Sequence, residues 1–117
     1  RGAPRDLECV ADPTDQDYGA SGVAKMSNVV GDPGPNGYRG NLTVSCQGLT
    51  PGATYDVSVG VYDPFIGPIR HFRSFTATKQ GTGQVTFRGI RFDGYHPLDI
   101  WVSRAGDVDV AILHGRF

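Results

Sequence analysis

The stretches Asn41-Leu-Thr-Val-Ser-Cys46 and Tyr55-Asp-Val-Ser-Val-Gly-Val61 both alternate apolar and polar residues. Successive side chains of a strand point to opposite faces, so each stretch predicts a β-strand with one buried face. Leu42, Val44 and Cys46 form the inward set of the first strand. The odd-numbered residues from Tyr55 to Val61 form that of the second. These two strands indicate the fold class.

Further strands are expected over residues 7–11, 22–30, 74–77, 85–87, 98–102 and 108–112, which gives about eight in all. The 17 glycines and 8 prolines are scattered between them, and they interrupt every window that could form an amphipathic helix. Phe72 breaks the alternation and suggests a bulge near Arg73. The pattern predicts a single all-β domain over residues 1–117, arranged as a two-sheet sandwich or a flattened barrel.

Composition excludes several classes of function. The 11 Lys and Arg against 12 Asp and Glu give a formal net charge of −1, without the basic excess that binding to nucleic acid or to an anionic membrane requires. The longest apolar run, Val110–Leu113, is far too short to span a bilayer. A chain of this length leaves no room for a separate cofactor domain, and no cofactor is expected. No signal peptide is recognisable at Arg1, so we expect a mature chain.

The two cysteines, Cys9 and Cys46, have no partners at metal-ligand spacing. A disulfide between them is the favoured interpretation. Within one chain it would close a loop of about 37 residues and stabilise the fold by roughly 3 to 4 kcal/mol. This interpretation predicts a secreted or cell-surface protein, whereas two buried thiols would be typical of a cytosolic one. Pairing across two chains is the remaining alternative.

The segment Leu49-Thr-Pro51-Gly52-Ala-Thr-Tyr55-Asp-Val-Ser-Val59 resembles the Leu-x-Pro-Gly-x-x-Tyr-x-Val-x-Val corner of fibronectin type III and related immunoglobulin-like sandwiches, including those of secreted bacterial proteins. The resemblance implies an immunoglobulin-like sandwich and a structural role for Leu49, Pro51, Gly52 and Tyr55. Pro51 presets a turn and Gly52 permits a positive φ, while the Tyr55 hydroxyl can bond to the backbone at the corner. About 55 residues follow Val61, more than that family has after its corner.

Candidate chemistry is sparse. Asp12, Asp15 and Asp17 resemble part of a calcium loop, but the position where such a loop has a bidentate Glu is Met26, so a solvated acidic turn is favoured. The three histidines lie in no catalytic motif, and we expect no enzyme; a serine triad assembled in space is the alternative. Asn41-Leu-Thr43 fits the N-glycosylation acceptor.

Several apolar side chains are candidates for contact with a partner: Phe65, Ile66, Tyr95, Trp101 and Phe117. The alternative is that they cover the ends or outer faces of the fold. In the last strand, Val108, Val110 and Ile112 are expected on one face and Ala111 and Leu113 on the other. That strand should therefore be covered on both sides, by this chain or by a neighbour.

Two functions follow as hypotheses. The first is an extracellular structural subunit that assembles into a homo-oligomer, fibre or surface layer through a sheet edge or terminal segment. The second is a monomeric module that binds a glycan or a protein through the aromatic loops and Trp101.

Overall fold

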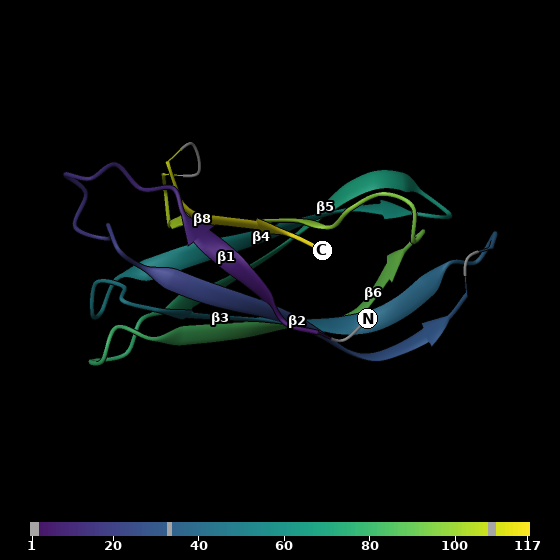
Figure 1. The fold of residues 1–117 in the computed structure, drawn as a ribbon, viewed down its shortest axis with the longest axis horizontal. Coiled ribbons are helices and arrows are strands. Elements are labelled where there is room, and N and C mark those ends of the chain that lie inside the picture. Colours follow the sequence, from purple (N-terminus) through teal and green to yellow (C-terminus); the bar gives the residue numbers. More distant parts are fainter. Residues whose placement is uncertain (1–2, 33, 108–109) are drawn as a thin grey trace.

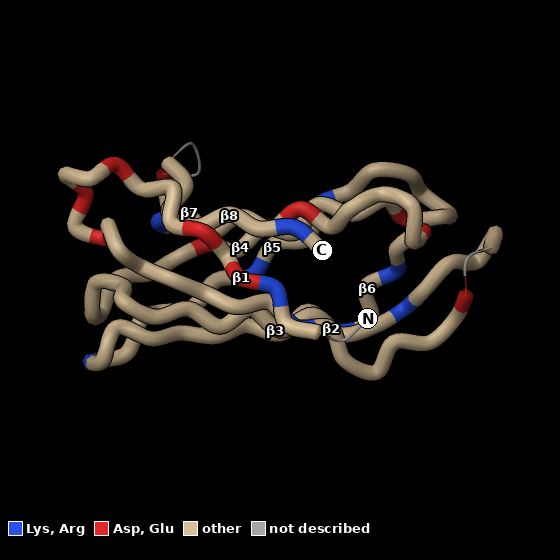
Figure 2. The backbone as a smooth tube through the Cα atoms, in the orientation of Figure 1, with Lys and Arg blue, Asp and Glu red and all other residues tan. Residues whose placement is uncertain are grey.

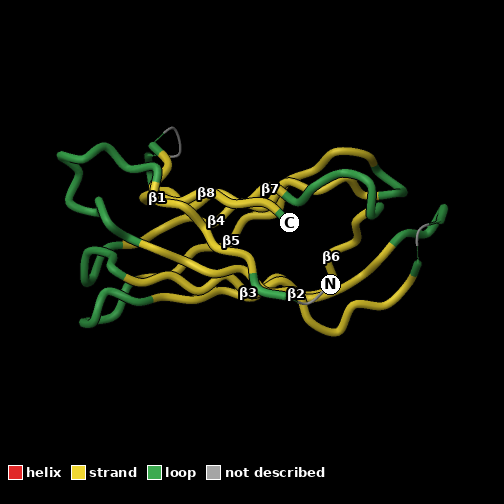
Figure 3. The backbone as a smooth tube through the Cα atoms, viewed as in Figure 1, coloured by secondary structure: helices red, strands yellow, loops and turns green. Residues whose placement is uncertain are grey.

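The computed structural model describes residues 3–32, 34–107 and 110–117. It contains eight antiparallel strands joined by loops (Figures 1 and 3). Their bounds are β1 Arg5–Cys9, β2 Ser21–Gly31, β3 Tyr38–Gln47, β4 Thr54–Asp63, β5 Gly67–Thr76, β6 Gly83–Phe92, β7 Asp99–Arg104 and β8 Ala111–Arg116. The all-β prediction is confirmed. Within the described ranges no helix is long and apolar enough to cross a membrane.

The strands form one continuous sheet in the order β5-β4-β7-β8-β1-β2-β3-β6. Strand β1 pairs with β8 on one side and with β2 on the other, so it joins the two layers seen in Figure 1. The edge strands β5 and β6 approach each other, since the ring of Phe75 packs on Gly83. A hydrogen bond from the Asp93 N–H to the Tyr62 carbonyl, 3.0 Å long, ties the two layers at the other end. The fold is therefore a nearly closed, flattened barrel rather than two separate sheets.

The core lies between the two layers and contains the inward sets expected from the alternation. The side chains without any exposed surface include Leu42, Val44, Tyr55, Val57, Val59, Ile100, Val102, Ile112 and Leu113. Strand β8 pairs with β7 and β1, and its consecutive residues Ile112 and Leu113 have no exposed surface, so this chain itself covers both. A register shift in the β7–β8 pairing accompanies this consecutive burial.

Two local predictions are wrong. Strand β5 pairs with β4 without a register shift, so there is no bulge near Arg73; Phe72 simply points to the outer face. Val110 is exposed in the turn before β8, where its N–H donates to the carbonyl of Asp107. Val108 lies outside the described residues.

The predicted disulfide is not formed, because Cys9 and Cys46 are both free thiols. Strand β2 separates their strands in the sheet, and two strand spacings amount to about 10 Å, more than a disulfide can span. The Cys9 sulfur instead accepts a hydrogen bond from the Gly19 N–H at 3.4 Å. Burial raises the pKa of the Cys46 thiol to about 12, which keeps that thiol protonated.

The corner at residues 49–55 is built around a buried carboxylate. Asp17 has no exposed surface, and its Oδ1 accepts hydrogen bonds from the Tyr55 hydroxyl at 2.8 Å and from the Thr50 N–H and hydroxyl at 2.9 and 2.8 Å. The Nε of Arg104 on β7 donates to Oδ2 at 3.0 Å. The Thr50 N–H also donates to the Tyr55 hydroxyl at 3.0 Å. One side chain thus joins the β1–β2 loop to the corner and to β7.

The other two acidic residues of this loop are used in the same structural way. Asp12 accepts from the Thr14 N–H and hydroxyl, and Asp15 accepts from the Asp17 N–H while it also pairs with Arg104. No cluster of potential metal ligands occurs in the described part of the chain. The geometry favours an acidic turn held by hydrogen bonds.

We expect Asp17→Asn to lower the free energy of unfolding by about 2 to 3 kcal/mol, because it removes the buried negative charge to which Thr50, Tyr55 and Arg104 donate, and leaves Arg104 with Asp15 as its ion-pair partner. Asp6→Asn, which changes an exposed carboxylate on β1, is the matched control and should leave the urea midpoint nearly unchanged. Equal midpoints for the two variants would contradict the role assigned to Asp17.

Candidate functional site

The outer face of β5, β4, β7 and β8 carries a row of side chains aligned by strand register. Phe72 lies opposite Ser58, Ser58 opposite Trp101, and Trp101 opposite His114. Trp101 points away from the core, as the alternation predicts, and its ring stacks on His114 with ring centroids 3.8 Å apart. In this row the small side chain of Ser58 has Phe72 on one side and Trp101 on the other.

A second row lies two residues further along the strands and contains Arg70, Gly60, Asp99 and Arg116. Asp99 is at its centre. Its carboxylate accepts hydrogen bonds from the Trp101 indole Nε1 at 2.7 Å and from His114 Nε2 at 2.7 Å. Arg70 on β5 donates to it at 3.0 Å, and Arg116 donates at 3.3 Å. Four side chains from three strands therefore converge on one acidic group.

This convergence keeps Asp99 ionised. Partial burial acts to raise the pKa of Asp99, but the hydrogen bonds from His114, Trp101, Arg116 and Arg70 outweigh it and lower the pKa to about 2. The carboxylate is a fixed negative charge with its acceptor sites occupied. Its function is to orient Trp101 and Arg70.

Gly60 is what lets Arg70 reach Asp99 across β4. Arg70 and Asp99 are both partners of Gly60 in the ladders, and a Cβ on that glycine would lie 3.2 Å from the Arg70 guanidinium. The bare backbone allows the arginine side chain to lie flat over the strand. The Arg70 guanidinium also donates a hydrogen bond to the Ser58 hydroxyl at 3.0 Å.

Two hollows lie next to each other along the outer face, since both are lined by Arg70, and we refer to them together as the groove. The hollow next to Trp101 has a volume of about 500 Å³, and its walls include Asp56, Ser58, Phe72 and Ser103. The hollow nearer the loops has a volume of about 450 Å³. Its lining includes Tyr62, Pro68, His96, Pro97 and Asp99. Pockets of this size are typical of small-ligand sites.

The two aromatic loops, residues 63–67 joining β4 to β5 and residues 93–98 joining β6 to β7, are built alike. Asp63 accepts hydrogen bonds from the backbone N–H groups of Phe65 and Ile66 at 2.7 and 3.2 Å. Asp93 accepts from those of Tyr95 and His96 at 2.9 and 3.0 Å, and its second oxygen contacts His96 Nδ1 at 2.5 Å.

These loops hold three of the predicted contact residues at the end of the barrel, where Phe65, Ile66 and Tyr95 are strongly exposed. Neither hollow of the groove includes any of them. His96 belongs to the groove because its ring stacks on Tyr62, with centroids 4.3 Å apart.

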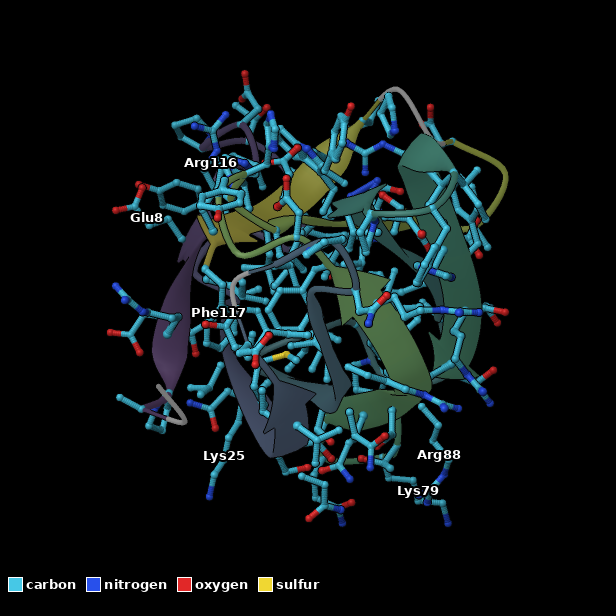
Figure 4. All side chains as sticks on the ribbon, turned by 90° about the vertical axis from the view of Figure 1, so that its right-hand side faces the viewer. Glu8, Lys25, Lys79, Arg88, Arg116 and Phe117 are labelled. Carbon is cyan, nitrogen blue, oxygen red and sulfur yellow. The ribbon has the colours of Figure 1, made fainter. Side chains whose placement is uncertain are left out.

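The structure separates the remaining predicted residues from the groove. Phe117 packs against the core and lies between the two layers, as Figure 4 shows, with Arg5 6.0 Å from its ring centroid. Asn41 is on the outer face of β3, in the other layer, where its side-chain oxygen accepts from the Gly89 N–H. Glycosylation of Asn41 stays a prediction.

Sequence reasoning found Trp101 but missed Phe72, Arg70 and Asp99, because these meet only through strand pairing. In the described part of the chain no hydroxyl or thiol is hydrogen-bonded to a histidine. The arrangement here is an aromatic groove with a fixed Asp99–Arg70 pair, which suits binding. Comparison with protein-family models, with curated proteins and with solved structures gives no match for this chain.

The lowered pKa of Asp99 predicts a pH-dependent contribution to stability. Its folded pKa lies below the usual 3.8, so the contribution is present above about pH 4 and is lost as the pH falls toward 2. Urea unfolding at pH 7 should find Asp99→Asn less stable than the unsubstituted protein by about 1 to 2 kcal/mol. That difference should shrink between pH 4 and pH 2. A difference that stays constant over this range would show that Asp99 is not held ionised by its neighbours.

Proposed function

We propose that the protein is a non-enzymatic recognition module that binds a carbohydrate in the groove beside Trp101. The observation that carries the proposal is the slot between Phe72 and Trp101. These residues stand two strands apart, about 10 Å between backbones, with only Ser58 between them. A flat ring fits there with van der Waals contact of about 3.5–4 Å on each side.

The polar groups of the slot suit a ligand rich in hydroxyls. Asp56 supplies a carboxylate acceptor, and Ser58 and Ser103 supply hydroxyl groups, all in the same hollow as the aromatic rings. Apolar ring faces beside a few placed polar groups are the usual composition of a small-ligand site. Asp99 and Arg70 form an ion pair, which leaves the Asp56 carboxylate as the remaining charge of the groove, so the groove favours a neutral sugar over an anionic one.

Self-assembly has less support from the strand arrangement. A donor strand must be free, whereas β1 and β8 are each hydrogen-bonded to two neighbours of their own chain. The edge strands β5 and β6 carry Arg70, Arg73, Arg88 and Arg91, and charged residues on edges oppose edge-to-edge pairing.

The immunoglobulin-like relationship and a secreted or cell-surface location belong to the same proposal. The support for the relationship is the corner, where Tyr55 is buried and its hydroxyl accepts from the Thr50 N–H. The disulfide that predicted this location is not formed, so the location is proposed from the groove alone, which in an extracellular protein would have access to glycans.

Trp101 is the single tryptophan of the chain, so its fluorescence reports on the groove directly. We expect a saturable change in Trp101 emission when a hexasaccharide of glucose, xylose or mannose is titrated into the protein. Phe72→Ala keeps the reporter but removes one wall of the slot, and should weaken binding about tenfold, the effect of losing roughly 1 to 2 kcal/mol of ring contact.

Tyr95→Ala is the matched control, since it removes an equally exposed aromatic side chain outside the groove. Its affinity should equal that of the unsubstituted protein. Absence of a response to all three sugars, or equal weakening by both variants, would refute the carbohydrate proposal. Light scattering of the same sample tests self-assembly, because a monomer of 12.5 kDa would exclude a polymer.

A further inference from the structure

The opposite layer of the barrel is basic. Strands β2, β3 and β6 contain no Asp or Glu, and they carry Lys25, Arg39, Arg88 and Arg91. In Figure 2 the lower layer has blue segments, and red appears at its right-hand end only beside the grey trace, whereas the upper layer has both colours along its length. Figure 4 shows Lys25 and Arg88 pointing outward from this layer, away from Arg116 and Glu8.

Two β-bulges meet in this layer. Between β2 and β3 the register shifts so that Asn28 and Val29 stand opposite Gly40. Between β3 and β6 it shifts so that Arg88 and Gly89 stand opposite the next residue, Asn41. Bulges re-aim side chains and are frequent beside functional sites.

Asn28 is the one non-glycine residue with a positive φ in the described part of the chain, at 53°. Such a conformation costs free energy and persists only where the surrounding structure holds it.

The bulges frame a hollow of about 400 Å³ that has Asn28, Arg39, Asn41 and Arg88 in its walls. Gly89 lets Arg39 lie close to the backbone, because a Cβ there would be 3.1 Å from the guanidinium. The Asn41 side-chain oxygen is used by the Gly89 N–H, so its amide NH₂ is what it can offer a ligand. The hollow therefore combines two guanidinium groups with an amide donor.

These arginines have no carboxylate partner among the described residues, unlike Arg70, Arg104 and Arg116, which all form ion pairs. Arg39 also lies directly opposite Arg91 in the β3–β6 ladder, and like charges in that position destabilise a sheet. Arg91 turns to the Phe65 ring, 5.3 Å from its centroid. Among the described residues, neither Arg39 nor Arg91 forms an ion pair with an acidic group.

The geometry points to a binding site for an oxyanion, the carboxylate or sulfate group of a small ligand, between Arg39 and Arg88. Guanidinium groups bind such oxyanions through two parallel hydrogen bonds each, and their charge would balance the unpaired positive charge of the layer. The site is in the opposite layer from the Trp101 groove and shares no residue with it. It stands whether or not the groove binds sugar.

The test is an NMR titration of unglycosylated ¹⁵N-labelled protein with sodium sulfate and, separately, sodium acetate, at ionic strength held constant with chloride. We expect saturable shifts of the Gly89 amide and of the Arg39 and Arg88 Nε signals with at least one anion. The anion that binds more tightly shows whether the site suits a tetrahedral or a planar group. Arg39→Gln and Arg88→Gln should each weaken binding about tenfold or more.

Lys25→Gln is the matched control, because it removes one positive charge from the same layer outside the hollow. It should leave the affinity within about twofold. Shifts that do not saturate with either anion would overturn the assignment, as would equal weakening by Lys25→Gln and Arg39→Gln, which indicates a diffuse charge effect. Urea midpoints establish that each variant is folded, and the two arginine variants are independent tests of the same site.

Discussion

The buried carboxylate of Asp17 is the constraint on which the rest of the structure depends. An enclosed charge is tolerated only when hydrogen bonds and an opposite charge compensate for its lost hydration. Its donors come from Thr50, Tyr55 and Arg104, which are far from Asp17 in sequence. The β1–β2 loop, the corner and β7 must therefore take their places together. Both β4 and β7, which carry the Trp101 groove, are positioned by this contact.

Alternation was sufficient to predict the strands but not how they join. The inward sets of β3, β4 and β7 are buried as expected, because the period of two is local. Whether β1 completes one sheet or begins another depends on long-range pairing, and no local pattern encodes it. The predicted disulfide failed for this reason, since Cys9 and Cys46 are separated by a strand that the alternation could not place between them.

The same limit governed the candidate site. Trp101 could be predicted to face outward because Ile100 and Val102 flank it. Trp101 lies two residues from Asp99 on the same strand, so their contact is local. Arg70 and His114 come close to Asp99 only through the pairing of β4 with β5, of β4 with β7 and of β7 with β8. Phe72 suggests a bulge that the β4–β5 pairing does not contain, because an exposed aromatic residue on an edge strand has no counterpart in a simple buried-face pattern. Such a residue is better regarded as a candidate contact.

The two layers differ in how their charged side chains are paired, and this gives the two proposed sites different electrostatic properties. In the groove, Arg70 and Asp99 form an ion pair with each other. A ligand there gains free energy mainly from contact with the aromatic rings and releases few bound ions. In the hollow, Arg39 and Arg88 hold charge that the described chain does not balance, so a bound anion gains Coulomb energy that dissolved salt screens. Sugar binding should therefore be nearly independent of ionic strength, while anion binding should weaken steeply as salt is added. That contrast follows from the ion pairs alone and does not depend on which sugar or which anion the protein meets.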